Sequence, residues 1–174
     1  LALAATTVLA APAFAAKDKV AIAPEEAAVR RLTGEQYRNV IRDVFGSTIE
    51  FGGHFEPGLK IGGLAAAGSG SIGVTAAGME QYDAIARVIA EQVVSETYRE
   101  QMIPCKPANA KTADDACAQQ FLSSVGRLLY RRPLTSASLS AHVAAAHAGA
   151  EATKDFYKGL GLSLAAMLSA PQFL

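Results

Sequence analysis

Three expected helix starts in this chain share one pattern, in which an apolar residue is followed by threonine. They are Leu32-Thr33, Val74-Thr75 and Leu134-Thr135. A threonine oxygen at the N-cap accepts an amide hydrogen that the first helical turn leaves unbonded, and the residue before it can pack on the fourth helical residue. The expected pairs are Leu32 with Tyr37, Val74 with Met79, and Leu134 with Leu139. Gln36 can complete a capping box with Thr33, so helices are predicted to begin after positions 33, 75 and 135.

Apolar residues recur at helical spacing in five groups. These groups are Tyr37, Val40, Ile41, Val44 and Phe45; Met79, Tyr82, Ile85, Ala86, Ile89 and Val93; Cys117, Phe121, Val125, Leu128 and Leu129; Leu139, Val143 and Ala146; and Phe156, Leu160, Leu164 and Leu168. Steps of three and four residues place side chains on one helix face, whereas strand patterns are nearly absent apart from a short candidate at residues 47–51. We therefore predict an all-α fold, a small irregular bundle of about five helices with a long glycine-rich loop between the first two.

The first sixteen residues carry no charge and end near Ala13-Phe14-Ala15, a small-x-small pattern typical of signal peptidase sites. Residues 1–15 are therefore predicted to be a signal peptide that lacks its basic start. The alternative is a transmembrane anchor, which needs roughly 20 apolar residues. We expect a periplasmic or secreted protein with no membrane span after signal cleavage. Its net charge of zero argues against a nucleic-acid partner.

Cys105 and Cys117 are the two cysteines of the chain. An oxidising compartment favours a disulfide between them, and closing so short a loop stabilises a fold by roughly 3 kcal/mol. Haem attachment would require a Cys-x-x-Cys-His sequence, and a zinc site would require about four ligands. We therefore predict a Cys105–Cys117 disulfide, and we expect no cofactor or metal in this segment.

The stretch 46–74 holds nine of the fifteen glycines. Irregular loops longer than about 15 residues are uncommon and are often functional. Within it, His54 and Glu56 form a possible loop site, because an imidazole and a carboxylate can bind a metal or move a proton. The alternative is that Phe51 and Phe55 anchor the loop to the helices beside solvated polar neighbours. A Gly-x-Gly-x-x-Gly match at residues 68–73 lacks the preceding strand of a dinucleotide site, so a flexible loop is the better interpretation.

Three arginines, Arg127, Arg131 and Arg132, cluster where the third predicted helix ends. Cations stabilise a helix C-terminus, and Pro133 prevents the helix from continuing. The alternative is that the arginines dock an acidic surface on a later domain. His142 and His147 are five residues apart, a spacing that does not align two metal ligands on one helix face.

Several motifs resemble one family of exported bacterial proteins. They are Leu32-Thr-x-x-Gln-Tyr-Arg-Asn-Val-Ile-Arg-Asp-Val-Phe-Gly46, Phe55-Glu-Pro-Gly58 followed by Gly63-Leu64, Val74-Thr-x-x-Gly-x-Glu-Gln-Tyr82, Cys117-Ala-x-x-Phe-Leu122, Leu128-Leu-Tyr-Arg-Arg-Pro-Leu-Thr135 and Gly159-Leu-x-Leu-x-Leu-Ala-Ala-Met-Leu-Ser-Ala-Pro-Gln-Phe-Leu174. The chain resembles the planctomycete-type domains of unknown function, in their proteobacterial branch, which often accompany c-type cytochrome modules. The resemblance implies an N-terminal fragment of a longer protein, with domains at 16–98, 99–152 and 153–174. The family has no assigned reaction, so no catalytic residue is carried over.

The motifs lack any complete catalytic constellation, so the segment is expected to be non-catalytic. We predict a scaffold or interaction module of a larger periplasmic protein, and we expect it to be redox-associated. The expected partners are downstream domains of the same chain, a c-type cytochrome or another periplasmic protein, and haem is expected only elsewhere in the full-length protein. The alternative is a fragment of an extracytoplasmic enzyme, whose active site would be completed by later domains.

Overall fold

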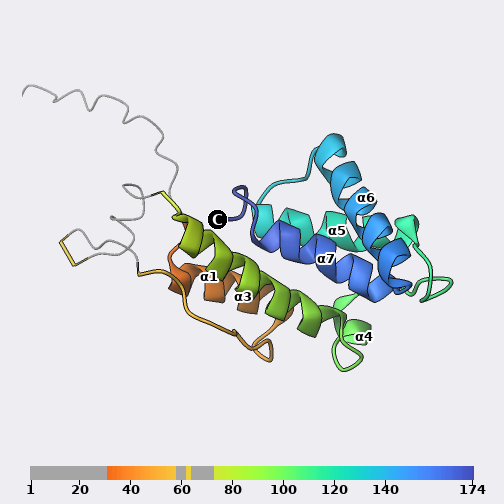
Figure 1. Cartoon of the computed structure of the whole chain (residues 1–174), viewed down its shortest axis with the longest axis horizontal. Helices are drawn as coiled ribbons and strands as arrows, with labels where there is room; N and C mark the ends of the chain where they lie inside the picture. Colours follow the sequence, from red (N-terminus) through yellow and green to blue (C-terminus); the bar gives the residue numbers. More distant parts are fainter. Residues whose placement is uncertain (1–30, 58–61, 64–72) are drawn as a thin grey trace, which may run out of the picture.

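All regular secondary structure in the described part of the chain is α-helix, as the sequence predicts (Figure 1). The computed structural model describes residues 31–57, 62–63 and 73–174, so the signal-peptide prediction and all of the Gly-x-Gly-x-x-Gly match except Gly73 lie outside the described residues. The helices are α1 (Gly34–Phe45), α3 (Ala76–Val94), α4 (Arg99–Met102), α5 (Asp115–Tyr130), α6 (Ser136–Thr153) and α7 (Phe156–Leu168). None of these helices is long and apolar enough to cross a membrane.

The three threonine caps are confirmed. Thr33 and Gln36 form the full capping box, with the Gln36 amide 3.2 Å from Thr33 Oγ1 and the Thr33 amide 2.9 Å from Gln36 Oε1. Thr75 caps α3 and Thr135 caps α6 in the same way. α5 and α7 are capped instead by aspartates, Asp114 and Asp155, whose carboxylates accept the first-turn amides. A carboxylate also favours the positive end of the helix dipole.

α7 lies at the centre of the packing, against α3 on one side and α6 on the other (Figure 1). Its predicted face is confirmed, because Phe156, Leu160, Leu164 and Leu168 are all buried. α6 approaches α7 closely at Gly159, where an added Cβ would overlap the backbone of Ala146 and Ala150. This close approach explains why α6, which is rich in alanine, buries mainly small residues: Ala146, Gly149 and Ala150.

Two residues assigned to buried faces are exposed. Met79 is 38% exposed and Leu128 is 47% exposed. Each lies one position from the true stripe, next to Gly78 and Leu129 respectively, and one position rotates a side chain by about 100° around a helix. Val74 is also exposed, so the predicted staple with Met79 adds little to the core. Residues 47–51 form no strand, although Ile49 is buried.

The two ends of the described chain meet beside α1. The Leu32 amide donates to the Leu174 carbonyl at 2.6 Å, and the Phe173 ring lies 5.0 Å from the ring of Tyr37. The Tyr37 hydroxyl also donates to the Leu168 carbonyl at 3.3 Å. One continuous hydrophobic core includes buried side chains from α1 to Phe173. The domain boundaries at 98 and 152 stay predictions.

Candidate functional site

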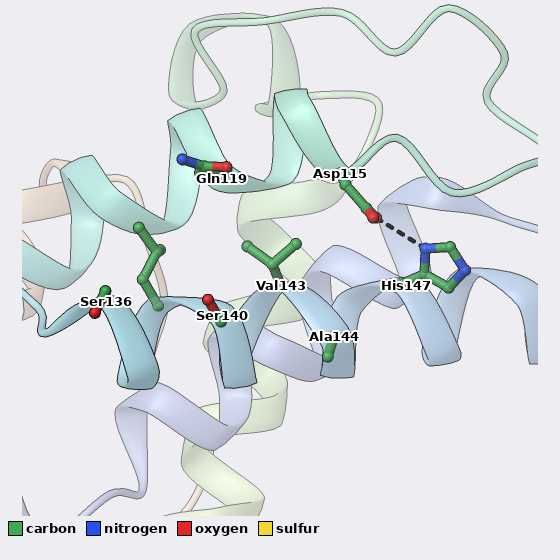
Figure 2. A pocket seen from close by; sticks show the side chains of 8 residues that line it. Asp115, Gln119, Ser136, Ser140, Val143, Ala144 and His147 are labelled. Carbon is green, nitrogen blue, oxygen red and sulfur yellow. Dashed lines mark hydrogen bonds and ion pairs between the residues drawn. The ribbon is translucent and has the colours of Figure 1, made fainter.

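A cleft of about 480 Å³ lies between α5 and α6 (Figure 2). It is lined by Asp115 and Gln119 from α5, and by Ser136, Leu139, Ser140, Val143, Ala144 and His147 from α6. Its volume falls in the range of roughly 300–1,000 Å³ that is usual for ligand sites. The lining combines apolar side chains with polar ones, which is the general character of a binding surface.

The cleft exists because α6 packs along α7 more closely than along α5. The buried residues of α6 are Ala146, Gly149 and Ala150, all in its second half. Its first half carries Leu139 and Val143, which are only half-buried. In Figure 1 the start of α6 stands apart from α5, and the two helices converge toward the end of α6. The facing position on α5 holds the polar Gln119, so no apolar side chain fills the space.

Asp115 and His147 close the narrow end of the cleft (Figure 2). His147 Nδ1 lies 2.8 Å from Asp115 Oδ1, and the two side chains are 50% and 59% exposed. Exposed pairs of this kind contribute about 0–1 kcal/mol to stability. The other α6 histidine, His142, is half-buried, and burial lowers the pKa of its imidazole. Its backbone carbonyl accepts a hydrogen bond from Ser163 Oγ at 2.8 Å.

The loop residues His54 and Glu56 lie in different surroundings. His54 is exposed. Glu56 binds the start of α3, since its Oε1 accepts a hydrogen bond from Thr75 Oγ1 at 2.8 Å. The other oxygen, Oε2, lies 3.6 Å from Arg31 Nη1. Within the described residues, no three His, Cys, Asp or Glu side chains form a group that could hold a metal ion.

Phe55 anchors the same loop to the helices. Its ring centroid lies 5.0 Å from that of Tyr37 and 5.5 Å from that of Tyr82. The Arg38 guanidinium covers its ring at 4.8 Å from the centroid. Phe51 lies under Arg42 in a similar way, at 5.7 Å. These contacts match the aromatic-anchor interpretation of the loop.

The three arginines are exposed around the end of α5. The helix ends at Tyr130, and Arg131 adopts a left-handed conformation with φ of 55°. Arg132 lies in a bend, and residues 133–134 lead to the extended cap residue of α6, Thr135. No ion pair joins Arg127, Arg131 or Arg132 to another residue in the described ranges. Their side chains therefore leave a cationic surface beside the connection between α5 and α6.

The predicted disulfide joins Cys105 to Cys117, with their Cα atoms 5.6 Å apart. Within the loop it closes, the Asp114 carboxylate accepts hydrogen bonds from the amides of Cys117 and Ala108, at 3.0 and 3.1 Å. These hydrogen bonds lower the pKa of the Asp114 carboxyl group. The loop also contacts α7, since the Phe156 amide donates to the Ala110 carbonyl at 2.8 Å.

Sequence reasoning missed the cleft residues Asp115, Gln119, Ser136 and Ser140. Asp115 is in the first turn of α5, where an acidic residue is expected for the helix dipole alone. The spacing from Asp115 to Gln119 places both on one helix face, which is the only local signal. The cleft itself depends on the angle between two helices, which no local pattern specifies.

This arrangement defines a small helical module with an open cleft between two helices. Residues 30–95 match the family model PSD3, described as a protein of unknown function (DUF1587), and residues 117–174 match PSD5, described as a protein of unknown function (DUF1595). The chain therefore carries two planctomycete-type domains of unknown function. No curated protein and no solved structure matches it.

Proposed function

We propose that this chain is a non-catalytic interaction module of an exported, periplasmic protein, and that it binds its partner through the α5–α6 cleft. The observation that carries the proposal is a pair of apolar side chains, Leu139 and Val143. Both line the cleft, and both are only half-buried, so part of their apolar surface faces solvent. Covering them would remove apolar surface from water, at roughly 25 cal/mol per Å².

The polar side chains that line the cleft suit a protein partner. Gln119, Ser136 and Ser140 each present a hydrogen-bond donor and an acceptor, as the edge of a protein interface does. Arg131 and Arg132 lie directly before α6 and supply a cationic flank, so an acidic partner surface is favoured. By resemblance, the partner is a later domain of the same protein or a c-type cytochrome, which would make the module redox-associated.

A photo-crosslinking side chain placed at Ser140 of the full-length protein in its own cells tests the proposal. Ala148, an exposed residue on α6 outside the cleft lining, is the matched control position. We expect a discrete crosslinked product from Ser140 that is lost with Val143→Glu and kept with Ala145→Glu. Equal products from Ser140 and Ala148, or a product that persists in Val143→Glu, would contradict the proposal.

The second candidate function is a contribution to an active site completed by later domains. Two buried atoms favour it, Arg31 Nη1 and Glu56 Oε2, which lie 3.6 Å apart as an ion pair and have no hydrogen-bond partner among the described residues. Buried unbonded polar atoms cost free energy and often mark functional sites. Turnover by the full-length protein that falls with Glu56→Gln, while the thermal midpoint is unchanged, would support this candidate over the first. Thr75→Val, which removes the hydrogen bond from Thr75 Oγ1 to Glu56 Oε1, controls for misplacement of the loop.

A further inference from the structure

The two sulfur atoms of the disulfide lie in unlike surroundings. Cys117 is 5% exposed and sits in the first turn of α5. Cys105 is half-buried and lines a cavity of about 260 Å³ together with residues of α4, the following loop and Tyr157. Thiol–disulfide exchange depends on which sulfur an external thiolate can reach. Access is therefore better at Cys105 than at Cys117.

The surrounding charges also favour attack at Cys105 over attack at Cys117. The cavity beside Cys105 is lined by two cations, Arg99 and Lys106, and by one carboxylate, Glu100. The Cys117 side carries the Asp114 carboxylate, which accepts a hydrogen bond from the Cys117 amide. An attacking thiolate is an anion, so the first surrounding attracts it and the second repels it.

Residues 103–114, which we name the strap, join the disulfide to two helices. Ile103 is buried at one end, and Asp114 caps α5 at the other. Between them, the Ala110 carbonyl accepts the hydrogen bond from the Phe156 amide, the first residue of α7. The disulfide fixes the strap at Cys105, five residues before this contact. Opening the disulfide would therefore loosen the strap and, through Ala110, the start of α7.

We propose that the Cys105–Cys117 disulfide is a thiol-exchange site for an external dithiol, and that its opening releases the first turn of α7. A thiolate of the dithiol bonds to Cys105 Sγ, the Sγ–Sγ bond breaks, and Cys117 leaves as a thiolate that takes a proton from water. The second thiolate of the dithiol then attacks its own partner sulfur in the mixed disulfide. The dithiol leaves as a disulfide and Cys105 leaves as a thiolate, so two electrons pass from the dithiol to the protein.

Reduced glutathione, a monothiol, tests the first step on the folded chain. After a short incubation, free thiols are blocked with N-ethylmaleimide and the modified cysteines are located by peptide mass spectrometry. We expect glutathione on Cys105 and maleimide on Cys117. Glutathione on Cys117, or no adduct until a denaturant unfolds the protein, would overturn the proposal.

Two lysines of the strap provide a matched pair for the charge argument. Lys106 lines the cavity, whereas Lys111 is exposed in the same strap outside the cavity lining. Lys106→Gln is expected to slow adduct formation by a factor of roughly 3 to 10 at low ionic strength, and Lys111→Gln to leave the rate unchanged. Equal rates for the two variants would refute the proposed approach of the thiolate.

Hydrogen exchange of the Phe156 amide tests the release of α7. In the reduced protein this amide is expected to exchange about tenfold faster than in the oxidised protein. The reason is that the disulfide no longer restrains residues 103–114, so the start of α7 opens locally more often. The Leu164 amide, in the middle of the same helix, is the internal reference. Equal Phe156 protection in both forms would show a purely structural bridge and refute the release. The double variant Cys105→Ser, Cys117→Ser should reproduce the reduced state without added thiol.

Discussion

The side-chain amide of Gln92 hydrogen-bonds both backbone groups of Glu50. The Glu50 amide donates to Gln92 Oε1 at 2.9 Å, and Gln92 Nε2 donates to the Glu50 carbonyl at 2.8 Å. One side chain thus satisfies the two backbone groups that a neighbouring strand would otherwise satisfy. This contact holds the loop after α1 against α3, in the stretch where the sequence suggested a short extended piece.

Replacing Gln92 with alanine is expected to destabilise the protein by about 1–2 kcal/mol, because both Glu50 groups lose their partner. Urea unfolding measures the free energy, and the Glu50 amide should exchange hydrogen faster. Gln81→Ala, at an exposed position on the same helix, is the control and should change stability by less than about 0.5 kcal/mol. Equal losses of stability from the two substitutions would show that the Gln92–Glu50 hydrogen bonds contribute nothing to stability.

Thr75 and Thr135 cap their helices alike, but only Thr75 also donates to Glu56. Thr135→Ala should lower the free energy of unfolding by about 1 kcal/mol, the usual value for loss of an N-cap. Thr75→Ala should cost more, by roughly 0.5–1.5 kcal/mol, because it breaks one further hydrogen bond. A double-mutant cycle with Glu56→Ala, which removes the acceptor, measures that added coupling by thermal or urea unfolding. A cost at Thr75 no larger than at Thr135 would argue against it.

Gly159 is required where α6 crosses α7. Gly159→Ala places a Cβ against the backbone of Ala146 and Ala150, which cannot move as a flexible side chain can. We expect a loss of about 1–3 kcal/mol, as for overpacked cores, measured as a lower urea midpoint. Gly73 has open space around its Cβ position, so Gly73→Ala should be close to neutral. A tolerated Gly159→Ala would mean that the two helices lie further apart.

Alkaline pH should destabilise the fold partly through Tyr130. Burial raises the pKa of the Tyr130 hydroxyl to about 12 from its ordinary 10. The unfolded chain therefore releases this proton first, so the contribution of neutral Tyr130 is present below pH 10 and is lost as pH rises toward 12. Tyr130→Phe should make the fall in stability shallower in this window, by less than about 1.4 kcal/mol per pH unit, since Tyr130 is only half-buried. Urea unfolding at pH 9, 10 and 11 measures the slope.

Local sequence chemistry predicted the helix starts well. The threonine caps work through contacts within three residues, so they need no knowledge of the fold. The face of α7 was also predictable, because this helix is surrounded on several sides and its leucines repeat every four residues. Met79 and Leu128 were wrongly predicted to be buried. A pattern of apolar residues shows which helix face is apolar, but it does not show how much of that face the neighbouring helices cover.

The cleft could not be predicted from the sequence in the same way. It depends on the divergence of α5 from α6, while α6 lies close against α7 where Gly159 meets Ala146. That contact joins residues distant along the chain. Similarly, the surroundings of Glu56 depend on its contact with Thr75, nineteen positions later. Side-chain type indicated a possible role for Glu56, whereas its structural partner came only from the fold.

The hydrogen bond between the Leu32 amide and the Leu174 carbonyl has a topological consequence. Any polypeptide before residue 32 and any polypeptide after residue 174 must leave the module at the same point on its surface. A short linker between these positions should therefore permit circular permutation, with new termini opened in an exposed turn such as the one near Lys154. In a longer protein, the segments before and after the module would therefore start from adjacent points. Deleting the module would change the distance between these two segments very little.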